Sequence, residues 1–247
     1  MIFAHDNLID QGTLTVYSED LNYPRNALRD YHLSNAFRST GLSTDEWIKI
    51  ELDDSSSADI AALVGHNLST GATIKIQGNT ADTWDAPTVD ESMDYSTGPI
   101  WKQFTGAKKK YWRFTISDTD NSDTYIEVGR AIITNKTDLT NTYSNTYTEA
   151  FQNTGRVRYS ITGQPFGVRG YEYRTLSLNV PYMDTDDKEN MRDMFADVQQ
   201  YEPILCIPDT ANDNDVKPIY CVLEEPFTAN HIFKHQYQGP VTLREVF

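Results

Sequence analysis

The stretch Ala61–Gly78, AALVGHNLSTGATIKIQG, decides the fold. Two apolar segments flank a short polar turn, in which Asn67 and Gly71 supply the turn chemistry. Apolar and polar residues alternate after the turn, over Thr73–Gln77, and they alternate in the same way upstream, over Trp47–Leu52 (WIKIEL). A period of two is typical of a strand with one buried face. These segments therefore predict neighbouring strands of a β domain.

Length and charge limit the classes of function. A chain of 247 residues is long enough for one large β domain or two smaller ones. Its net charge of −15 disfavours nucleic-acid binding and anionic membrane surfaces. The main basic cluster, Lys108–Lys110, is interpreted as a solvated strand entrance. The N-terminus lacks a basic segment followed by an apolar one, and no apolar run reaches membrane-spanning length. The expected protein is therefore soluble, made in a cytoplasm and not inserted in a membrane.

Composition along the chain predicts two domains. Residues 1–134 form the first, a β domain in which Tyr111–Ile116 alternates with Trp112, Phe114 and Ile116 on the core face. Residues 135–155 are rich in Thr and Asn and predict a polar linker or extended arm, with an edge strand that pairs with a neighbouring subunit as the alternative.

Residues 156–247 predict an α+β domain. Met191, Met194, Phe195 and Val198 fall on one face of a helix over about 185–200, and acidic residues at its start suit the helix dipole. Strands are predicted on both sides of this helix, at 156–161, 173–180, 203–207, 217–224 and 240–246.

Three segments in the first domain carry a family resemblance. Arg38–Thr40, then WIKIEL at 47–52, then ALVGHNLSTGATI at 62–74 resemble the discoidin or galactose-binding-like β-sandwich, in the version found in tail proteins of long-tailed bacteriophages. The resemblance covers about half the chain. In the other half, the glycines of 167–170, the single helix and the terminal strand at 241–247 are similar to minor and distal tail components.

The resemblance implies a mainly β protein, with an N-terminal galactose-binding-like jelly-roll β-sandwich and a C-terminal α+β assembly domain. It implies a structural component of a phage tail that forms a homo-oligomeric ring with other tail proteins, from the tube, hub or tape-measure region. Such a protein would be made in the host cytoplasm and located in the virion. The alternative is a carbohydrate-binding module that recognises a glycan of the host surface. Neither interpretation predicts an enzyme.

Candidate sugar-binding residues lie in segment 79–105, which is interpreted as loops between strands. Sugar sites combine aromatic faces with planar polar groups. The candidates are Trp84, Tyr95 and Trp101, with the carboxylates of Asp82, Asp85 and Asp90 nearby. The favoured interpretation is that these aromatic side chains pack the loops or fill a subunit interface.

One acidic segment has the ligand spacing of a calcium site. Asp118, Asp120 and Asp123 place oxygen atoms at near-alternate positions, as hard cations prefer, but the Gly and distal Glu of a complete calcium loop are missing. A solvated acidic turn is the favoured interpretation, and the same alternatives hold for the acidic segment 209–215. No other cofactor is predicted.

Catalytic and cysteine chemistry have little support. The chain has no G-x-S-x-G motif, and its five histidines are scattered; His231 and His235 are four residues apart but not on a predicted helix. Cys206 and Cys221 lie in apolar segments and are interpreted as reduced core thiols, with a disulfide as the alternative.

Overall fold

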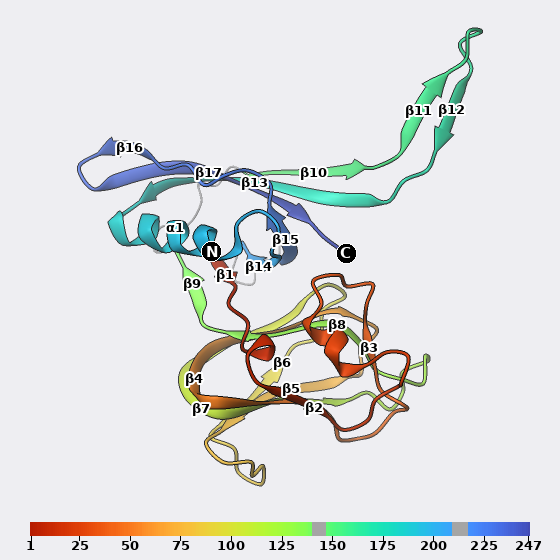
Figure 1. Cartoon of the computed structure of the whole chain (residues 1–247), viewed down its shortest axis with the longest axis vertical. Coiled ribbons are helices and arrows are strands. Elements are labelled where there is room, and N and C mark those ends of the chain that lie inside the picture. Colours follow the sequence, from red (N-terminus) through yellow and green to blue (C-terminus); the bar gives the residue numbers. More distant parts are fainter. Residues whose placement is uncertain (140–146, 209–216) are drawn as a thin grey trace. The chain divides into compact units, whose positions relative to one another are not determined.

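The computed structural model describes residues 1–139, 147–208 and 217–247 and is mainly β (Figure 1). The chain divides into two compact units. The first comprises residues 1–138, 204–220 and 247, and the second comprises residues 139–203 and 221–246. The predicted fold class, mainly β with an N-terminal β-sandwich and one helix in the C-terminal part, is confirmed.

The first unit contains eleven strands and two short 3-10 helices along its described residues. They are β1 (Ile2–Ala4), η1 (Leu8–Asp10), β2 (Thr13–Val16), η2 (Arg25–Arg29), β3 (Phe37–Arg38), β4 (Glu46–His66), β5 (Thr73–Asn79), β6 (Val89–Met93), β7 (Ile100–Ser117), β8 (Glu127–Thr134), β9 (Lys136–Asp138) and β14 (Ile204–Ile207), together with the first residues of β15 (Ile219–Leu223). β1 pairs with both β9 and β14.

Two long strands build the sandwich. The sheet order is β3-β8-β4-β7-β5-β6, with β2 beside β4, and all of these strands pair antiparallel. β4 and β7 run together through irregularities near Glu51–Ser56 and Ala58–Ile60, where both strands bend from one layer into the other (Figure 1). Their two halves therefore belong to different layers: β2-β4-β7-β5-β6 on one side and β3-β8-β4-β7 on the other.

The predicted alternation sets which face is buried. Ile48, Ile50 and Leu52 are buried in β4, whereas the residues between them are partly exposed. Ile50 lies opposite Trp112, whose ring is fully buried. On its other side, Trp112 lies opposite Gly78 of β5, and a Cβ at Gly78 would lie 2.6 Å from the Trp112 ring. Only glycine leaves room for that ring.

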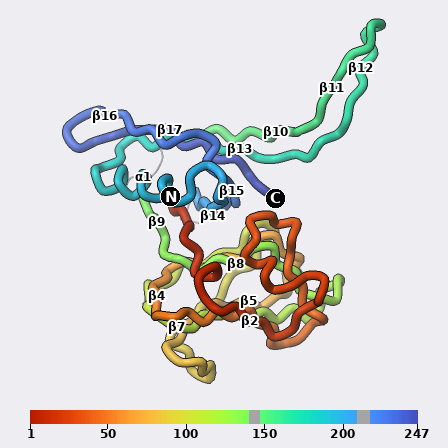
Figure 2. Tube along the Cα trace, in the orientation of Figure 1, coloured from red at the N-terminus to blue at the C-terminus, as the bar shows by residue number. Residues whose placement is uncertain are grey.

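Within its described residues, the second unit is a sheet with one helix and one projecting hairpin. Its elements are β10 (Tyr147–Asn153), β11 (Arg156–Tyr159), β12 (Pro165–Val168), β13 (Glu172–Met183), α1 (Thr185–Val198), the last residues of β15, β16 (Asn230–Phe233) and β17 (Gln236–Glu245). β13 pairs with β10 and β17, and β17 also pairs with β15 and β16. β11 and β12 continue outward from β10 and β13 as a two-stranded ribbon (Figure 2).

The helix agrees with its sequence pattern. Met191, Met194 and Val198 are buried, while Phe195 is only half-buried. The Asp184 side chain caps the helix by accepting a hydrogen bond from the Asp187 backbone N–H at 2.8 Å. Within the described residues, no helix is both long and apolar enough to cross a bilayer.

Other predicted segments lie as follows. Segment 135–155 holds β9 and β10, and residues 140–146 lie outside the described residues. Segment 79–105 contains β6 and the start of β7, so the prediction that it consists of loops is wrong for these residues. Cys206 and Cys221 are both buried thiols.

A buried acid predicts that the stability of the first unit depends on pH. Glu46 is only 5% exposed, and the Ser18 hydroxyl donates to its carboxylate at 3.1 Å. Burial raises the pKa of Glu46 above its usual value, although the Ser18 hydrogen bond opposes this. A raised folded-state pKa favours the folded state below the pKa of the unfolded chain, and this contribution is lost as pH rises through the folded pKa.

Glu46→Gln is therefore expected to raise the midpoint of thermal unfolding at pH 7, with a smaller gain near pH 4. All four tryptophans lie between residues 47 and 112, so their fluorescence reports on the first unit. The exposed Glu225→Gln is the control and should change the midpoint at neither pH. An equal gain at both pH values would contradict the assignment.

Candidate functional site

A row of polar side chains crosses the outer face of one sandwich layer. Lys49 of β4 lies opposite Arg113 of β7, Arg113 lies opposite Gln77 of β5, and Gln77 lies opposite Asp90 of β6. Neighbouring residues in a strand point to opposite faces. The row is therefore turned away from the core row that contains Trp112.

Hydrogen bonds hold the row in fixed orientations. Arg113 Nε donates to Gln77 Oε1 at 2.7 Å, and Gln77 Nε2 donates to Asp90 Oδ1 at 3.0 Å. Lys75 Nζ donates to the other Asp90 oxygen at 3.1 Å. The Gln77 hydrogen bond and Lys75 lower the pKa of Asp90. The side chains of Arg113, Gln77 and Asp90 are therefore held in fixed orientations by their mutual hydrogen bonds.

The loop between β5 and β6 places an aromatic ring over this row. Trp84 Nε1 donates to Asp82 Oδ1 at 2.7 Å, and Lys49 Nζ donates to Asp82 Oδ2 at 2.6 Å. Lys49 and then Trp84 lower the pKa of Asp82. The Arg113 guanidinium lies 4.2 Å from the centroid of the Trp84 ring.

We name this surface the Trp84 face. It comprises Lys49, Gln77, Asp82, Trp84, Asp90 and Arg113. Two further aromatic side chains lie beside the Trp84 face. The centroid of the Trp47 ring is 5.4 Å from Lys49 Nζ, and this ring packs edge-on against Tyr17, which is 55% exposed. Aromatic rings beside oriented amide, guanidinium and carboxylate groups are the chemistry that recognises polyhydroxylated ligands.

The structure separates the predicted sugar-binding residues. Asp82, Asp85 and Trp84 share the β5–β6 loop, whereas Tyr95 follows β6 and therefore leaves the sheet at the opposite end of that strand. Tyr95 packs edge-on against His66, with ring centroids 6.1 Å apart. Trp101 lies within β7, in the half that belongs to the other layer of the sandwich.

The predicted calcium residues serve the turn itself. Asp118 is 2% exposed and accepts hydrogen bonds from Ser69 N at 2.7 Å, Ser69 Oγ at 2.5 Å and Asn121 Nδ2 at 3.1 Å. Asp123 accepts from Asn67 Nδ2 at 3.1 Å. Asp120 is exposed, and no cluster of three His, Cys, Asp or Glu side chains suited to a metal occurs in the described residues. The acidic segment 209–215 lies outside these residues.

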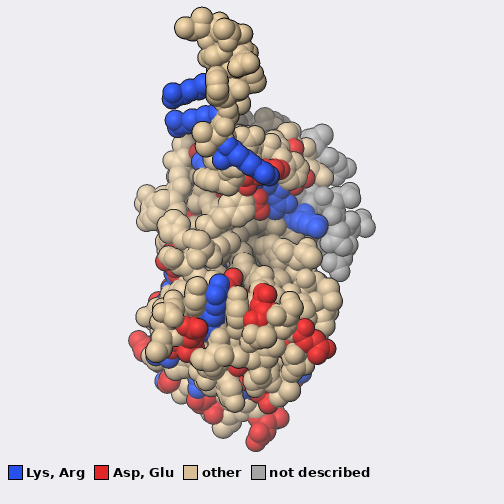
Figure 3. All heavy atoms as spheres, turned by 90° about the vertical axis from the view of Figure 1, so that its right-hand side faces the viewer, with Lys and Arg blue, Asp and Glu red and all other residues tan. Residues whose placement is uncertain are grey.

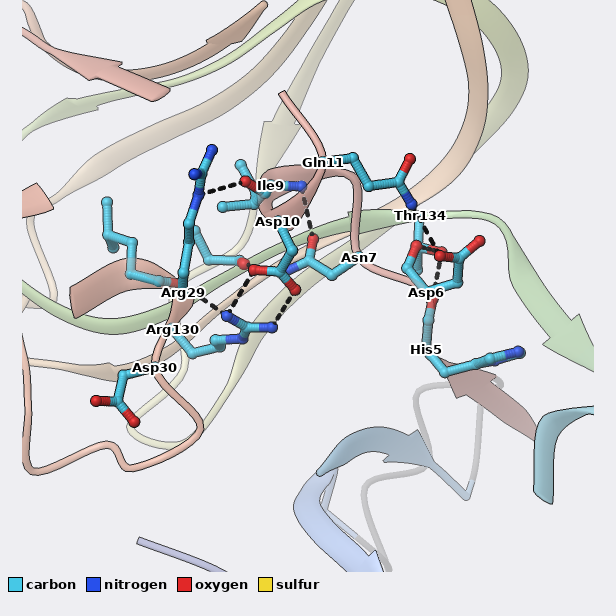
Figure 4. A network of polar contacts seen from close by, with 12 residues as sticks. His5, Asp6, Asn7, Ile9, Asp10, Gln11, Arg29, Asp30, Arg130 and Thr134 are labelled. Carbon is cyan, nitrogen blue, oxygen red and sulfur yellow. Dashed lines mark hydrogen bonds and ion pairs between the residues drawn. The ribbon is translucent and has the colours of Figure 1, made fainter. Parts of the chain in front are cut away.

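Two features escaped the sequence analysis. One is a hollow of about 410 Å³ in the segment that connects β2 to β3, lined by Asn22, Tyr23, Pro24, Asn26, Ala27, Asp30, Ser34, Asn35 and Ala36. The other is an ion pair made by a buried arginine (Figure 4): Arg130, 3% exposed, donates to both Asp10 oxygens, at 2.9 and 2.5 Å, and to the Leu28 carbonyl oxygen at 3.2 Å. Only the clustered Asn and Ser of residues 22–36 could have signalled the hollow.

Comparisons with known proteins give similarities to solved structures alone. No protein-family model and no curated protein matches the chain. A chitosan-binding module from a chitosanase/glucanase of Paenibacillus sp. IK-5 is 18% identical, with a TM-score of 0.42, and the match covers 52% of this chain and 98% of the module.

Two further solved structures are similar at lower identity. The lectin domain of lectinolysin, solved with Lewis B antigen, is 10% identical over 53% of this chain and 98% of that domain, with a TM-score of 0.43. A fucose-binding module of Streptococcus pneumoniae is 11% identical over 52% of this chain and 97% of that module, with a TM-score of 0.42.

Proposed function

We propose that the first unit binds glycans through the Trp84 face. The observation that carries this proposal is the Trp84 ring, held by Asp82 and by Arg113 at the end of a row of hydrogen-bonded planar groups. A sugar ring stacks its apolar face on an indole, and its hydroxyl groups pair with guanidinium and carboxylate groups. The Gln77 amide is only 7% exposed, and its role here is to orient Arg113 and Asp90. Because these side chains are already ordered, little conformational entropy is lost on binding.

The charge of the chain narrows the class of glycan. A net charge of −15 repels uronates and sulfated sugars over long range, so neutral or amino-sugar glycans are the expected ligands. The tail-protein interpretation, with its ring, its tail partners and its place in the virion, stays a prediction that rests on the sequence resemblance. The absence of enzymatic activity also stays a prediction.

Trp84→Ala is expected to weaken glycan binding about tenfold or more, because the stacking ring is lost. The test is an array of neutral and amino-sugar glycans that includes fucose, Lewis b and chitosan oligosaccharides, followed by titration calorimetry on the best ligand. Trp101→Ala is the matched control, since Trp101 lies in the other layer, and its affinity should equal that of the wild type.

A second variant locates the site. Asn35→Ala removes an amide from the hollow in the segment that connects β2 to β3 and should leave affinity unchanged. Loss of binding in Asn35→Ala but not in Trp84→Ala would move the site to that hollow. A wild-type protein that binds no glycan on the array at millimolar concentration would overturn the proposal. Near-UV circular dichroism confirms that each variant is folded.

A further inference from the structure

The hairpin of β11 and β12, which we call the arm (residues 154–171), has no core of its own. All eight residues of the two strands are exposed. They include Tyr159 at 73%, Phe166 at 61% and Val168 at 76% exposure. A two-stranded ribbon exposed on both faces is marginally stable at best in water. Its apolar side chains therefore require a covering partner.

The arm is cationic on an acidic protein. Arg156, Arg158 and Arg169 lie in it, and it contains no Asp or Glu, whereas the whole chain carries −15. Lys and Arg side chains stand out from the arm and its base in Figure 3. A partner for the arm should therefore be acidic.

One face of the arm combines charge with apolar surface. Arg156 lies opposite Val168 and Arg158 lies opposite Phe166, so these four side chains share a face. A hollow of about 530 Å³ lies along this face, between Thr154 and Gly170. Alternate residues of a strand are about 6.6 Å apart, which sets the spacing of the two guanidinium groups.

The same unit carries an acidic stripe of matching spacing. Asp186, Glu189, Asp193 and Asp197 are the exposed acids of α1, and their intervals of three and four residues place them along one side of the helix. Residues four apart in a helix are about 6 Å apart along its axis. Asp193 pairs with Arg192, but both side chains are more than 60% exposed, and such a pair is easily exchanged.

The arm and the acidic stripe face different directions within their unit. α1 starts after the end of β13 that is remote from the arm, and the arm projects away from the helix (Figure 1). We propose that the arm of one copy docks on α1 of a second copy, with Arg156 and Arg158 against Asp193 and Asp197. This contact is heterologous, so repetition of it produces a closed ring or an open filament.

Charge-swapped variants test the contact on the full-length chain. Wild-type protein is expected to self-associate in sedimentation velocity, and Arg156→Glu/Arg158→Glu should weaken association about tenfold or more. Asp193→Lys/Asp197→Lys should weaken it similarly. An equimolar mixture of the two variants should recover association, because each arm then meets a helix of opposite charge. Lys108→Glu/Lys234→Glu, the same charge change at exposed positions elsewhere, is the control and should associate like the wild type.

Each alternative gives a distinct result. A wild-type chain that stays monomeric at high concentration, or variants that do not recover on mixing, would overturn the proposal. Co-flotation of the monomer with phosphatidylserine vesicles, lost in Arg156→Glu/Arg158→Glu, would assign the arm to a lipid surface instead. A photo-crosslinker at Phe166, with mixed isotope-labelled and unlabelled chains, should join the arm to an α1 peptide of the other copy. Circular dichroism shows whether the variants stay folded.

Discussion

Arg130→Ala is expected to lower the free energy of unfolding of the first unit by about 3 kcal/mol, the lower end of the range for breaking a buried ion pair. The guanidinium holds both Asp10 oxygens and the Leu28 carbonyl oxygen and lies 5.3 Å from the Tyr31 ring centroid. Truncation leaves these acceptors without that donor. The Asp10 side chain is 31% exposed, so water compensates for part of the loss. Urea unfolding followed by tryptophan fluorescence measures the change.

Two further variants separate geometry from charge. Arg130→Lys keeps the charge but cannot form the two parallel hydrogen bonds, so it should recover only part of the loss. Arg25→Ala removes an exposed ion pair with Glu19 and should cost no more than about 1 kcal/mol. If Arg130→Ala were no more costly than Arg25→Ala, the pair of Arg130 and Asp10 would not be a main source of stability.

Asp118→Ala is expected to cost about 3 kcal/mol, since one buried carboxylate accepts three hydrogen bonds. The two bonds from Ser69 join the turn after β4 to the turn after β7, whereas the Asn121 bond lies within the turn after β7. Loss of the carboxylate leaves the two partly buried Ser69 donors without this acceptor, whereas Asn121 Nδ2 still donates to the Asn67 carbonyl oxygen at 3.0 Å. Unfolding in urea, with tryptophan fluorescence as the probe, gives the size of the effect.

Asp120→Ala is the matched control, because it removes an exposed acid from the same turn and should be near neutral. Chelation with EDTA or addition of calcium should leave the unfolding midpoint of the wild type unchanged. A midpoint that rises by several degrees in calcium, and no longer does so in Asp120→Ala, would establish the calcium site considered from the sequence.

Local pattern predicted those parts of the structure that depend on neighbours in sequence. The alternation of Trp47–Leu52 and the apolar face of α1 each reflect burial of one side of a regular element. The segments 47–52 and 61–66 were predicted as separate strands, although the single strand β4 runs through both. The polar residues between these segments lie where the strand bends between layers and carries irregular pairs.

The candidate site was only partly predictable for a related reason. Trp84 and Asp82 were found because an aromatic and an acid stand close together in sequence. Lys49 and Arg113 were missed because strand register alone brings them together, across 64 positions. Trp101 was assigned to a loop, whereas it is the second residue of β7.

The continuity of β4 and β7 has a mechanical consequence. In a sandwich of separate strands, one sheet can peel from the other while its own ladder stays intact. Here β4 and β7 run through both sheets, so separation of the sheets would have to break the backbone pairing of these two strands at the bends. The first unit is therefore expected to unfold as a single body under an applied force, with both sheets lost together.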